Sequence, residues 1–317
     1  MKTMISFCAL LVLAGVLLMT ACSGDSGSAS GPKGIKGPVT VGSKSDTEGS
    51  LLAQMIILIL RDKGYQTVDK SQFGETSIVR KAIISGEIDI YPEYTGNGAY
   101  FFNEADSPVW KDAKKGYERV KTLDKQTNNI EWLTPAPANN TWAIAITKAL
   151  ANQERLVSLA DLAAFVNRGG KVRLIGSEEF VTSAAALPAF EQAYGFRLTQ
   201  DQLVKIQSGN TAQTEKAASE GTDGVNAAMA YGTDGGLSAF GLVVLTDPQG
   251  VQPVYAPAPI VRGPILAKYP EIAAALGAAF ETLDLVTLQT LNGRIAVNGE
   301  NPANVARDYL RQRGLLR

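Results

Sequence analysis

The feature that most constrains the fold is a series of strands and helices that occurs twice along the chain. In the first copy a short apolar run, PVTVGS (38–43), precedes a long apolar helix pattern, EGSLLAQMIILILRDKG (48–64). A second helix pattern (76–87) is followed by the apolar run IDIY (88–91). Strands that alternate with helices predict a mostly parallel sheet that is covered by helices on both faces.

The second copy repeats the short glycine-containing sequences of the first. The residues GSK (42–44) after the first strand correspond to GSE (176–178), and YTGNG (94–98) corresponds to YGTDG (231–235). Sequence identity between the copies is low, so the match depends on the order and spacing of these residues. The alternative is a chance match between turn residues that are common in α/β proteins. We predict two similarly built α/β lobes.

Two proline-rich segments frame the second copy: LTPAPANNTWAIAI (133–146) and VQPVYAPAPIVRG (251–263). Proline lacks the N–H that a central strand needs, and it suits a segment that joins two domains. We therefore predict that residues 38–138 and 255–317 form lobe one and that residues 139–254 form lobe two. Two hinge crossings of this kind leave a cleft between the lobes, which is a favoured place for a small ligand.

The N-terminus is typical of an exported protein. Residues 1–21 combine a basic start at Lys2, an apolar run and small residues before Cys22, which predicts a signal peptide and lipidation of Cys22. Soluble export and a permanent transmembrane anchor are the alternatives, and the apolar run is short for a spanning helix. Residues 22–37 are rich in glycine and serine and predict a flexible tether behind the lipid anchor.

The composition argues against several classes of function. The 317 residues include no histidine, which removes Ser-His-Asp and Cys-His catalysis and most zinc hydrolase sites. No GxxxxGK[ST] loop is present, and a formal net charge of −1 gives no electrostatic case for nucleic acid. We predict no catalytic residue, no metal site and no cofactor. The rival is an extracellular enzyme with paired carboxylates such as Glu48 and Glu93, for which the sequence offers no placed nucleophile.

Aromatic side chains gather at the predicted cleft. Tyr94 follows the run IDIY, Tyr231 is its equivalent in the second copy, and Trp142 and Tyr255 lie on the two crossings. Because ligands of α/β sheets sit beyond the carboxyl ends of the strands, we expect the four rings to meet. A quaternary ammonium has no N–H to donate, but ring faces attract it through cation–π interactions. The pattern predicts an aromatic cage for a choline-like cation, and plain core packing is the alternative for each ring.

Five short sequences carry a resemblance to a known family: VGSKSDTEGSLLAQMI, SGEIDIYPEYTGNG, NNTWAIAI, AYGTDG and YAPAPIVR. Together they resemble the substrate-binding proteins of ABC-type osmoprotectant importers, the glycine betaine/choline/carnitine family, and look most like its periplasmic member associated with low-affinity betaine uptake. The likeness runs from about Val39 to the C-terminus. It implies a two-lobed periplasmic binding protein of type II topology that traps its ligand and delivers it to a membrane permease and its ATPase.

The resemblance also implies which residues bind the ligand. Cage aromatics and polar contacts of the family fall on Tyr94, Trp142, Tyr231, Tyr255, Lys44, Asn97 and Asn140. Lys44 and Asn97 stand where the family contacts the ligand carboxylate. Two positions depart from the family's pattern, since Asn140 replaces an acidic residue near the cage and Ser183 replaces an arginine that grips the carboxylate. The aromatic half of the site is thus intact, while the loss of a bidentate donor weakens the carboxylate half.

We therefore expect a monomeric solute-binding protein in the periplasm or on the outer cell surface, held to the membrane only through lipid at Cys22. Its ligand would be glycine betaine or a related quaternary-ammonium compatible solute. Binding of a different small cleft ligand, such as an amino acid, and service as the ectodomain of a sensor are the alternatives.

Overall fold

The computed structural model describes residues 36–207 and 211–317, which belong to one compact unit. The predicted signal peptide, the lipidation at Cys22 and nearly all of the predicted tether lie outside the described residues. Within the described ranges, no helix is both long and apolar enough to cross a membrane.

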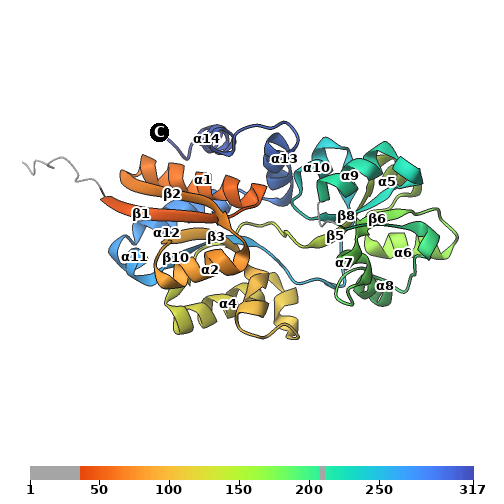
Figure 1. Cartoon of the computed structure of the whole chain (residues 1–317), viewed down its shortest axis with the longest axis horizontal. Coiled ribbons are helices and arrows are strands. Elements are labelled where there is room, and N and C mark those ends of the chain that lie inside the picture. Colours follow the sequence, from red (N-terminus) through yellow and green to blue (C-terminus); the bar gives the residue numbers. More distant parts are fainter. Residues whose placement is uncertain (1–35, 208–210) are drawn as a thin grey trace, which may run out of the picture. The chain divides into compact units, whose positions relative to one another are not determined.

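Two five-stranded sheets organise the described chain, one in each lobe (Figure 1). The first sheet has the order β2-β1-β3-β10-β4 and contains β1 (Lys36–Lys44), β2 (Tyr65–Gly74), β3 (Ile90–Tyr94), β4 (Ile130–Trp132) and β10 (Pro257–Arg262). The second has the order β7-β6-β8-β5-β9 and contains β5 (Trp142–Thr147), β6 (Leu174–Ser177), β7 (Leu203–Ile206), β8 (Ala227–Tyr231) and β9 (Leu242–Val244).

The two sheets have equivalent strand orders and directions. In the first, β1 is parallel to β2 and β3, and β10 runs antiparallel to β3 and β4. In the second, β6 is parallel to β7 and β8, and β5 runs antiparallel to β8 and β9. Each sheet is therefore mostly parallel with one reversed strand, and the reversed strand is the one that follows a crossing between the lobes.

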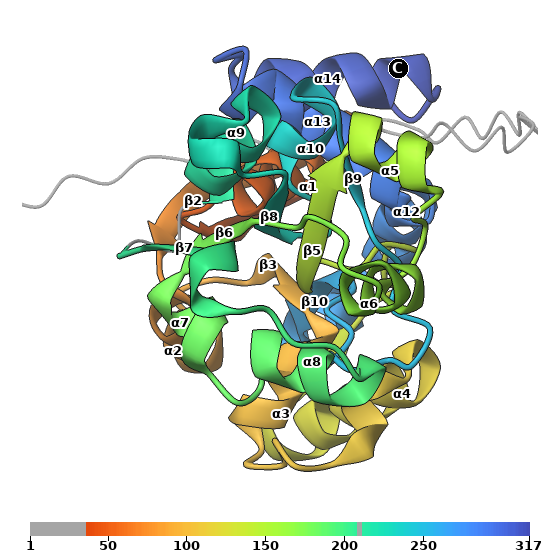
Figure 2. The same ribbon diagram turned by 90° about the vertical axis from the view of Figure 1, so that its right-hand side faces the viewer.

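Helices cover both faces of each sheet (Figures 1 and 2). Those of the first lobe are α1 (Thr47–Asp62), α2 (Thr76–Ser85), α3 (Gly98–Phe101), α4 (Ala113–Asn128), α11 (Gly263–Lys268), α12 (Glu271–Phe280), α13 (Leu285–Ala296) and α14 (Pro302–Gln312). Those of the second lobe are α5 (Lys148–Glu154), α6 (Leu159–Asn167), α7 (Glu178–Thr182), α8 (Leu187–Tyr194), α9 (Thr211–Glu220) and α10 (Gly235–Ala239). Four buried apolar clusters result, one on each face of each sheet.

The N-terminus of helix α1 positions two acidic residues, Asp46 and Glu48, at the cleft. Asp46 caps its N-terminus by accepting a hydrogen bond from the Gly49 N–H at 2.6 Å, which satisfies one of the free donors of the first turn. The apolar face of the helix is fully buried, for example at Leu51 and Ile56. This packing also carries Glu48, a first-turn carboxylate, into the interior beside the cleft.

Two extended segments connect the lobes and lie against each other. The first runs from β4 to β5 over residues 133–141, and the second runs from β9 to β10 over residues 245–256. The Ala136 N–H donates to the Pro257 carbonyl at 2.8 Å, and the Asn140 N–H donates to the Tyr255 carbonyl at 3.0 Å. The lobe boundaries expected after residue 138 and before residue 255 fall within these two segments.

The C-terminal helices differ from the sequence prediction. The pattern of residues 271–291 predicts one helix, but the structure has two, because Asp284 begins α13 by accepting a hydrogen bond from the Thr287 N–H at 2.8 Å. Helix α13 then packs on α10 of the second lobe. A Cβ atom on Gly235 would lie 2.3 Å from the Gly293 nitrogen, so the two backbones meet directly. Helix α13 therefore contacts the second lobe while its Leu288 and Leu291 side chains pack in the core of the first lobe.

Candidate ligand-binding cleft

A cavity of about 1540 Å³ lies between the two lobes. Its wall comes from strand ends, the first turns of helices and both crossings. All of the side chains expected at the ligand are in this wall, namely Lys44, Tyr94, Asn97, Asn140, Trp142, Tyr231 and Tyr255. The sequence therefore identified one surface and not scattered residues.

The strand ends position three of the four predicted cage aromatics. Tyr94 is the last residue of β3 and Tyr231 is the last residue of β8, so each strand extends as far as its aromatic residue. Trp142 is the first residue of β5 and lies opposite Tyr231 in the antiparallel register. The Trp142 and Tyr231 rings stack with centroids 6.4 Å apart and planes 21° apart, and both side chains are half-buried. Their remaining surface is free for a ligand.

Tyr255, the fourth ring, lies on the return crossing and packs over Gly96. A Cβ atom on Gly96 would lie 2.8 Å from the Tyr255 ring, so only glycine allows this approach. The Tyr255 N–H donates to Asn139 Oδ1 at 2.8 Å, which fixes the backbone next to the ring. The YTGNG segment therefore supplies both Tyr94 and the gap that admits Tyr255.

Tyr94 is already engaged on two sides. Its hydroxyl donates to Glu48 Oε1 at 2.8 Å, and the ring is only 5% exposed. The Lys44 ammonium lies over the ring at 4.1 Å from the centroid, which is the position a bound ammonium would take in a cation–π contact. In this structure Lys44 occupies one face of a predicted cage tyrosine.

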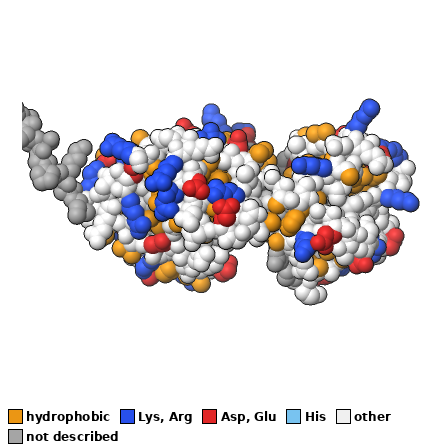
Figure 3. Space-filling view, turned by 90° about the horizontal axis from the view of Figure 1, so that it is seen from above, with side chains coloured by type: hydrophobic (Ala, Val, Ile, Leu, Met, Phe, Trp, Pro, Cys, Tyr) orange, Lys and Arg blue, Asp and Glu red, His pale blue; other side chains and the backbone are white. Residues whose placement is uncertain are grey.

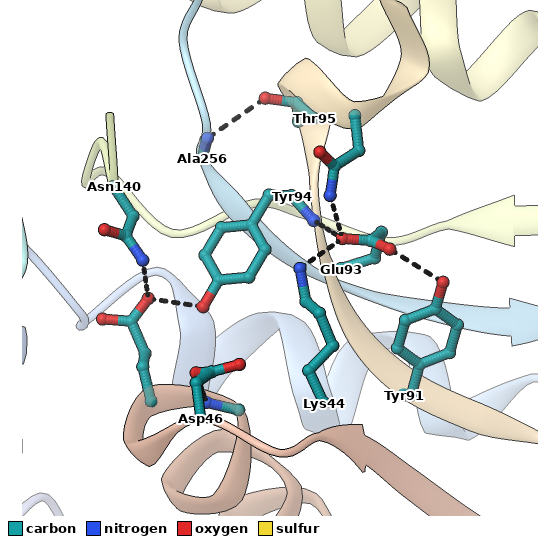
Figure 4. Close-up of polar contacts among 11 residues, drawn as sticks. Lys44, Asp46, Tyr91, Glu93, Tyr94, Thr95, Asn140 and Ala256 are labelled. Carbon is teal, nitrogen blue, oxygen red and sulfur yellow. Dashed lines mark hydrogen bonds and ion pairs between the residues drawn. The ribbon is translucent and has the colours of Figure 1, made fainter. Parts of the chain in front are cut away.

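Lys44 donates to the buried carboxylate of Glu93 (Figure 4), and Asn97 donates to the same group. Glu93 Oε1 accepts hydrogen bonds from Lys44 Nζ at 3.0 Å, from Asn97 Nδ2 at 2.7 Å and from the Tyr94 N–H at 2.7 Å. The Tyr91 hydroxyl donates to the other oxygen at 2.8 Å. The two residues expected to contact a ligand carboxylate are thus held by a carboxylate of the chain itself.

Glu48 is a cleft residue whose part in the site was not predicted from the sequence. Its side chain is buried and accepts hydrogen bonds from the Tyr94 hydroxyl, from Asn140 Nδ2 at 3.3 Å and from Asn292 Nδ2 at 2.7 Å. Burial disfavours the charged form and raises the pKa of Glu48 to about 7, although these hydrogen bonds oppose the rise. The only sequence signal was a carboxylate in the first turn of an apolar helix.

Asn140 stands beside this carboxylate. Its Nδ2 atom donates to Glu48 Oε1, so the position where some relatives have an acid faces an acid here. An aspartate at position 140 would place two carboxylates in contact, and such a pair shares a proton instead of carrying two charges. The acidic group that lies next to position 140 is therefore Glu48.

Ser183 lies at the C-terminal end of α7, where its Oγ accepts a hydrogen bond from the Ala185 N–H at 3.4 Å. The neighbouring residues Ala184 and Ala185 belong to the cavity wall, while Ser183 is not among the wall residues that the structure describes. Position 183 is therefore adjacent to the cleft instead of directly in it.

Carboxyl groups outnumber basic groups among the described wall residues. Among the described wall residues only Lys44 and Lys111 are basic, and both come from the first lobe. The acidic ones are Asp46, Glu48, Glu75, Asp106, Glu215 and Asp234. The outer surface differs from the wall, because basic and acidic side chains are mixed over both lobes on the face drawn in Figure 3. Within the described ranges, no group of three or more carboxylate or cysteine side chains is placed to hold a metal ion.

Two α/β lobes with matching strand orders, joined by two crossings around an aromatic and acidic cavity, define a substrate-binding protein of the periplasmic type. Residues 37–312 match the family model described as the substrate binding domain of ABC-type glycine betaine transport systems. The chain therefore belongs to this family. It is the extracytoplasmic substrate-binding component of an ABC importer for betaine-type solutes, which works with a membrane permease and an ATPase.

Individual relatives agree with this family. The chain is 54% identical over 301 residues to the glycine betaine-binding protein YehZ of Escherichia coli, covering 95% of this chain and 97% of the relative. It is 31% identical over 282 residues to a glycine-betaine-binding protein of Pseudomonas aeruginosa, covering 87% and 88%. The structure of apo YehZ from Escherichia coli superposes with a TM-score of 0.84 at 56% identity, covering 88% of this chain and 100% of that one. The predicted family and the predicted two-lobed fold are confirmed.

Proposed function

We propose that the protein binds glycine betaine or a related quaternary-ammonium compatible solute between Tyr94, Trp142, Tyr231 and Tyr255. One observation carries this proposal: four aromatic residues from separate parts of the chain line a single cavity whose wall is predominantly acidic. Ring faces attract an ammonium that cannot donate hydrogen bonds, and the surrounding carboxyl groups add to that attraction. The related proteins of Escherichia coli and Pseudomonas aeruginosa carry glycine betaine in their names, which agrees with this ligand class.

The carboxylate end of a betaine would meet Lys44 and Asn97 from the first lobe. Both side chains now donate to Glu93, so a ligand carboxylate would compete with Glu93 for them. This competition, together with Ser183 in place of an arginine, makes the carboxylate contact the weak part of the site. Closure of the lobes over the ligand would then present the closed form to the permease.

The remaining parts of the proposal concern state and place. The protein acts as a monomeric binding component without chemistry of its own, and Glu48 and Glu93, the carboxylates of the rival enzyme, are both engaged by donors of the chain. Lipid at Cys22 would hold it at the membrane surface, an expectation that depends on the TAC sequence after the apolar run. Mass spectrometry of the mature N-terminus should find a lipidated Cys22. An unmodified mature chain that starts at another residue would contradict the lipid anchor and support soluble export.

Calorimetric titration of the purified protein with betaine, choline, carnitine, proline betaine and ectoine tests the ligand class. At least one quaternary ammonium should bind, and ectoine, which has none, should bind more weakly. A titration series in which ectoine binds and no quaternary ammonium binds would contradict the proposal. Small-angle scattering with and without saturating ligand tests closure, because the radius of gyration should fall when ligand is bound; an unchanged value with binding confirmed would contradict trapping.

A further inference from the structure

The cavity wall contains buried oxygen atoms that have no hydrogen-bond donor. Within the described part of the chain, these atoms are Asn140 Oδ1, Thr141 Oγ1, Glu215 Oε1 and Asn292 Oδ1. Buried polar atoms are rarely left without a partner, so a group of them in one cavity points to a ligand or water that supplies donors. Glycine betaine has neither N–H nor O–H groups and cannot supply them.

The orientation of the Asn292 amide is fixed by its surroundings. Its Nδ2 atom donates to Glu48 Oε2 at 2.7 Å and to the Thr233 carbonyl at 2.9 Å, and a backbone carbonyl can only accept. The amide therefore cannot be turned around, and Oδ1 is the atom left without a donor. The side chain is 4% exposed and reaches the cleft because α13 packs on α10 through Gly235 and Gly293.

Glu215, on α9 of the second lobe, is another buried hydrogen-bond acceptor that its neighbours hold in place. The residue is 1% exposed, and its side chain is hydrogen-bonded to Asp234, the residue whose Oδ2 accepts the Tyr231 N–H at 2.7 Å. Burial and the Asp234 carboxylate raise the pKa of Glu215, so its acid form donates to Asp234 while Oε1 stays free to accept. A Cβ atom on Gly236 would lie 1.8 Å from Glu215 Oε2, so glycine there leaves room for this carboxyl group.

Hydrogen bonds connect these acceptors to two of the proposed cage tyrosines. Asn292 contacts Thr233, which precedes Asp234, and Asp234 in turn holds both Glu215 and the backbone of Tyr231. On the other side, Asn292 contacts Glu48, which holds the hydroxyl of Tyr94. A ligand whose ammonium sits among the rings would thus have the free oxygens of Glu215 and Asn292 within the same cavity.

We propose that Glu215 and Asn292 form a subsite for an N–H or O–H donor carried by the ligand, so that the cleft favours quaternary ammonium solutes larger than glycine betaine that bear such a donor. This inference rests on the proposed function of the cleft. Its specific content is that a donor on the ligand increases affinity, because it satisfies acceptors that the protein leaves unpaired.

Matched ligand pairs test the subsite by calorimetry. Carnitine and γ-butyrobetaine differ only in a hydroxyl group, and N-trimethylhistidine and N-trimethylphenylalanine differ in the ring, which carries an N–H only in the histidine compound. In at least one pair, the compound with the donor should bind at least about tenfold more tightly than the compound without it. The pair that shows this difference identifies whether the subsite prefers an O–H or an N–H donor. Equal affinities within both pairs, as expected if water satisfies these oxygens, would overturn the inference.

Two variants locate the effect at Glu215. Glu215→Met removes both acceptor atoms at similar size and should abolish the preference for the donor, so that carnitine and γ-butyrobetaine bind this variant with equal affinity. Glu215→Gln retains an acceptor and an N–H that can donate to Asp234, so it should keep the preference. If the preference survives Glu215→Met, the subsite lies elsewhere and the inference is wrong. If the parent protein binds no quaternary ammonium at all, the proposed function itself fails, which is a separate result from equal binding within a pair.

Discussion

The Lys44 ammonium lies 4.1 Å from the centroid of the Tyr94 ring and 3.0 Å from the Glu93 carboxylate. A cation of the protein therefore already occupies a ring face that a ligand cation would use. Lys44→Met should free this face and raise the affinity for tetramethylammonium, which has no carboxylate, on the order of fivefold. Glycine betaine should gain less, because it also loses a proposed carboxylate contact.

Lys111→Met is the matched control for this change. It removes the other basic residue of the described wall without freeing a ring, so it should not reproduce the selective gain for tetramethylammonium. Lys44→Met should also lower the free energy of unfolding by about 1–3 kcal/mol, since buried Glu93 loses one of its donors. A similar gain for both ligands in both variants would indicate a general charge effect and contradict the ring-face explanation.

The four aromatic residues should each matter for binding. Changing Tyr94, Trp142, Tyr231 or Tyr255 to alanine should cost on the order of 1–2 kcal/mol, or roughly tenfold in affinity for a quaternary ammonium. The corresponding phenylalanine variants of the tyrosines keep the ring and should retain most of the affinity, apart from Tyr94→Phe, which also loses the hydrogen bond to Glu48. Titration calorimetry separates the two sets. If all four alanine variants bind as well as the parent, the cage does not exist.

Stability should depend on pH through Glu48. Because burial raises its folded-state pKa to about 7, the folded protein holds a proton that the unfolded chain releases near pH 4.5. The free energy of unfolding should therefore decrease as pH rises from about 4.5 to about 7, by on the order of 3 kcal/mol from this residue. Residues that face the carboxyl group are Asp46, Tyr94, Asn140, Thr233 and Asn292, and only Asp46 adds a charge.

No histidine contributes in this pH range, because the chain has none. Burial also raises the pKa values of Glu215 and Asp234, which gives a slope of the same sign. Denaturant unfolding of the parent and of Glu48→Gln between pH 5 and pH 8 isolates the contribution of Glu48. The variant should show a clearly smaller loss of stability with rising pH; identical slopes would mean that Glu48 titrates normally.

An arginine should strengthen the carboxylate half of the site. Ser183→Arg should raise the affinity for betaine relative to choline by about tenfold, because a guanidinium pairs bidentately with a carboxylate and choline has none. Ala184→Arg places the same group at a residue that lines the cavity and provides a second position. If neither variant changes the ratio of betaine to choline affinity, the ligand carboxylate does not point towards α7.

Much of the site could be predicted from the sequence because short local signals mark it. Strands β3 and β8 each end in a tyrosine that is followed by a glycine-rich turn, and the two tyrosines lie at the carboxyl ends of strands in two similar sheets. The prolines of the crossings indicated where the chain passes between lobes. Short sequence motifs are sufficient to predict these site residues because this fold brings the strand ends together.

The unpredicted features depend on contacts between distant segments. From the sequence, Glu48 was considered only as a carboxylate of a rival enzyme, and only the packing of α1 shows that it is buried beside Asn140 and Asn292. The pairing of Lys44 and Asn97 with Glu93 is likewise a tertiary contact that residue type alone cannot specify. The break before α13 had a local signal, since Asp284 precedes an apolar run as an N-cap residue does.

The most direct measurement compares glycine betaine with tert-butylacetate, in which carbon replaces the ammonium nitrogen at nearly constant shape. If Tyr94, Trp142, Tyr231 and Tyr255 hold the ligand by its positive charge, calorimetric titration should show saturable binding of betaine. Binding of tert-butylacetate should be about tenfold weaker or more, since neither the ring faces nor the acidic wall attracts a neutral group. Equal binding of the two compounds would show that the cavity recognises shape and carboxylate only, and would contradict an aromatic cage for a quaternary ammonium.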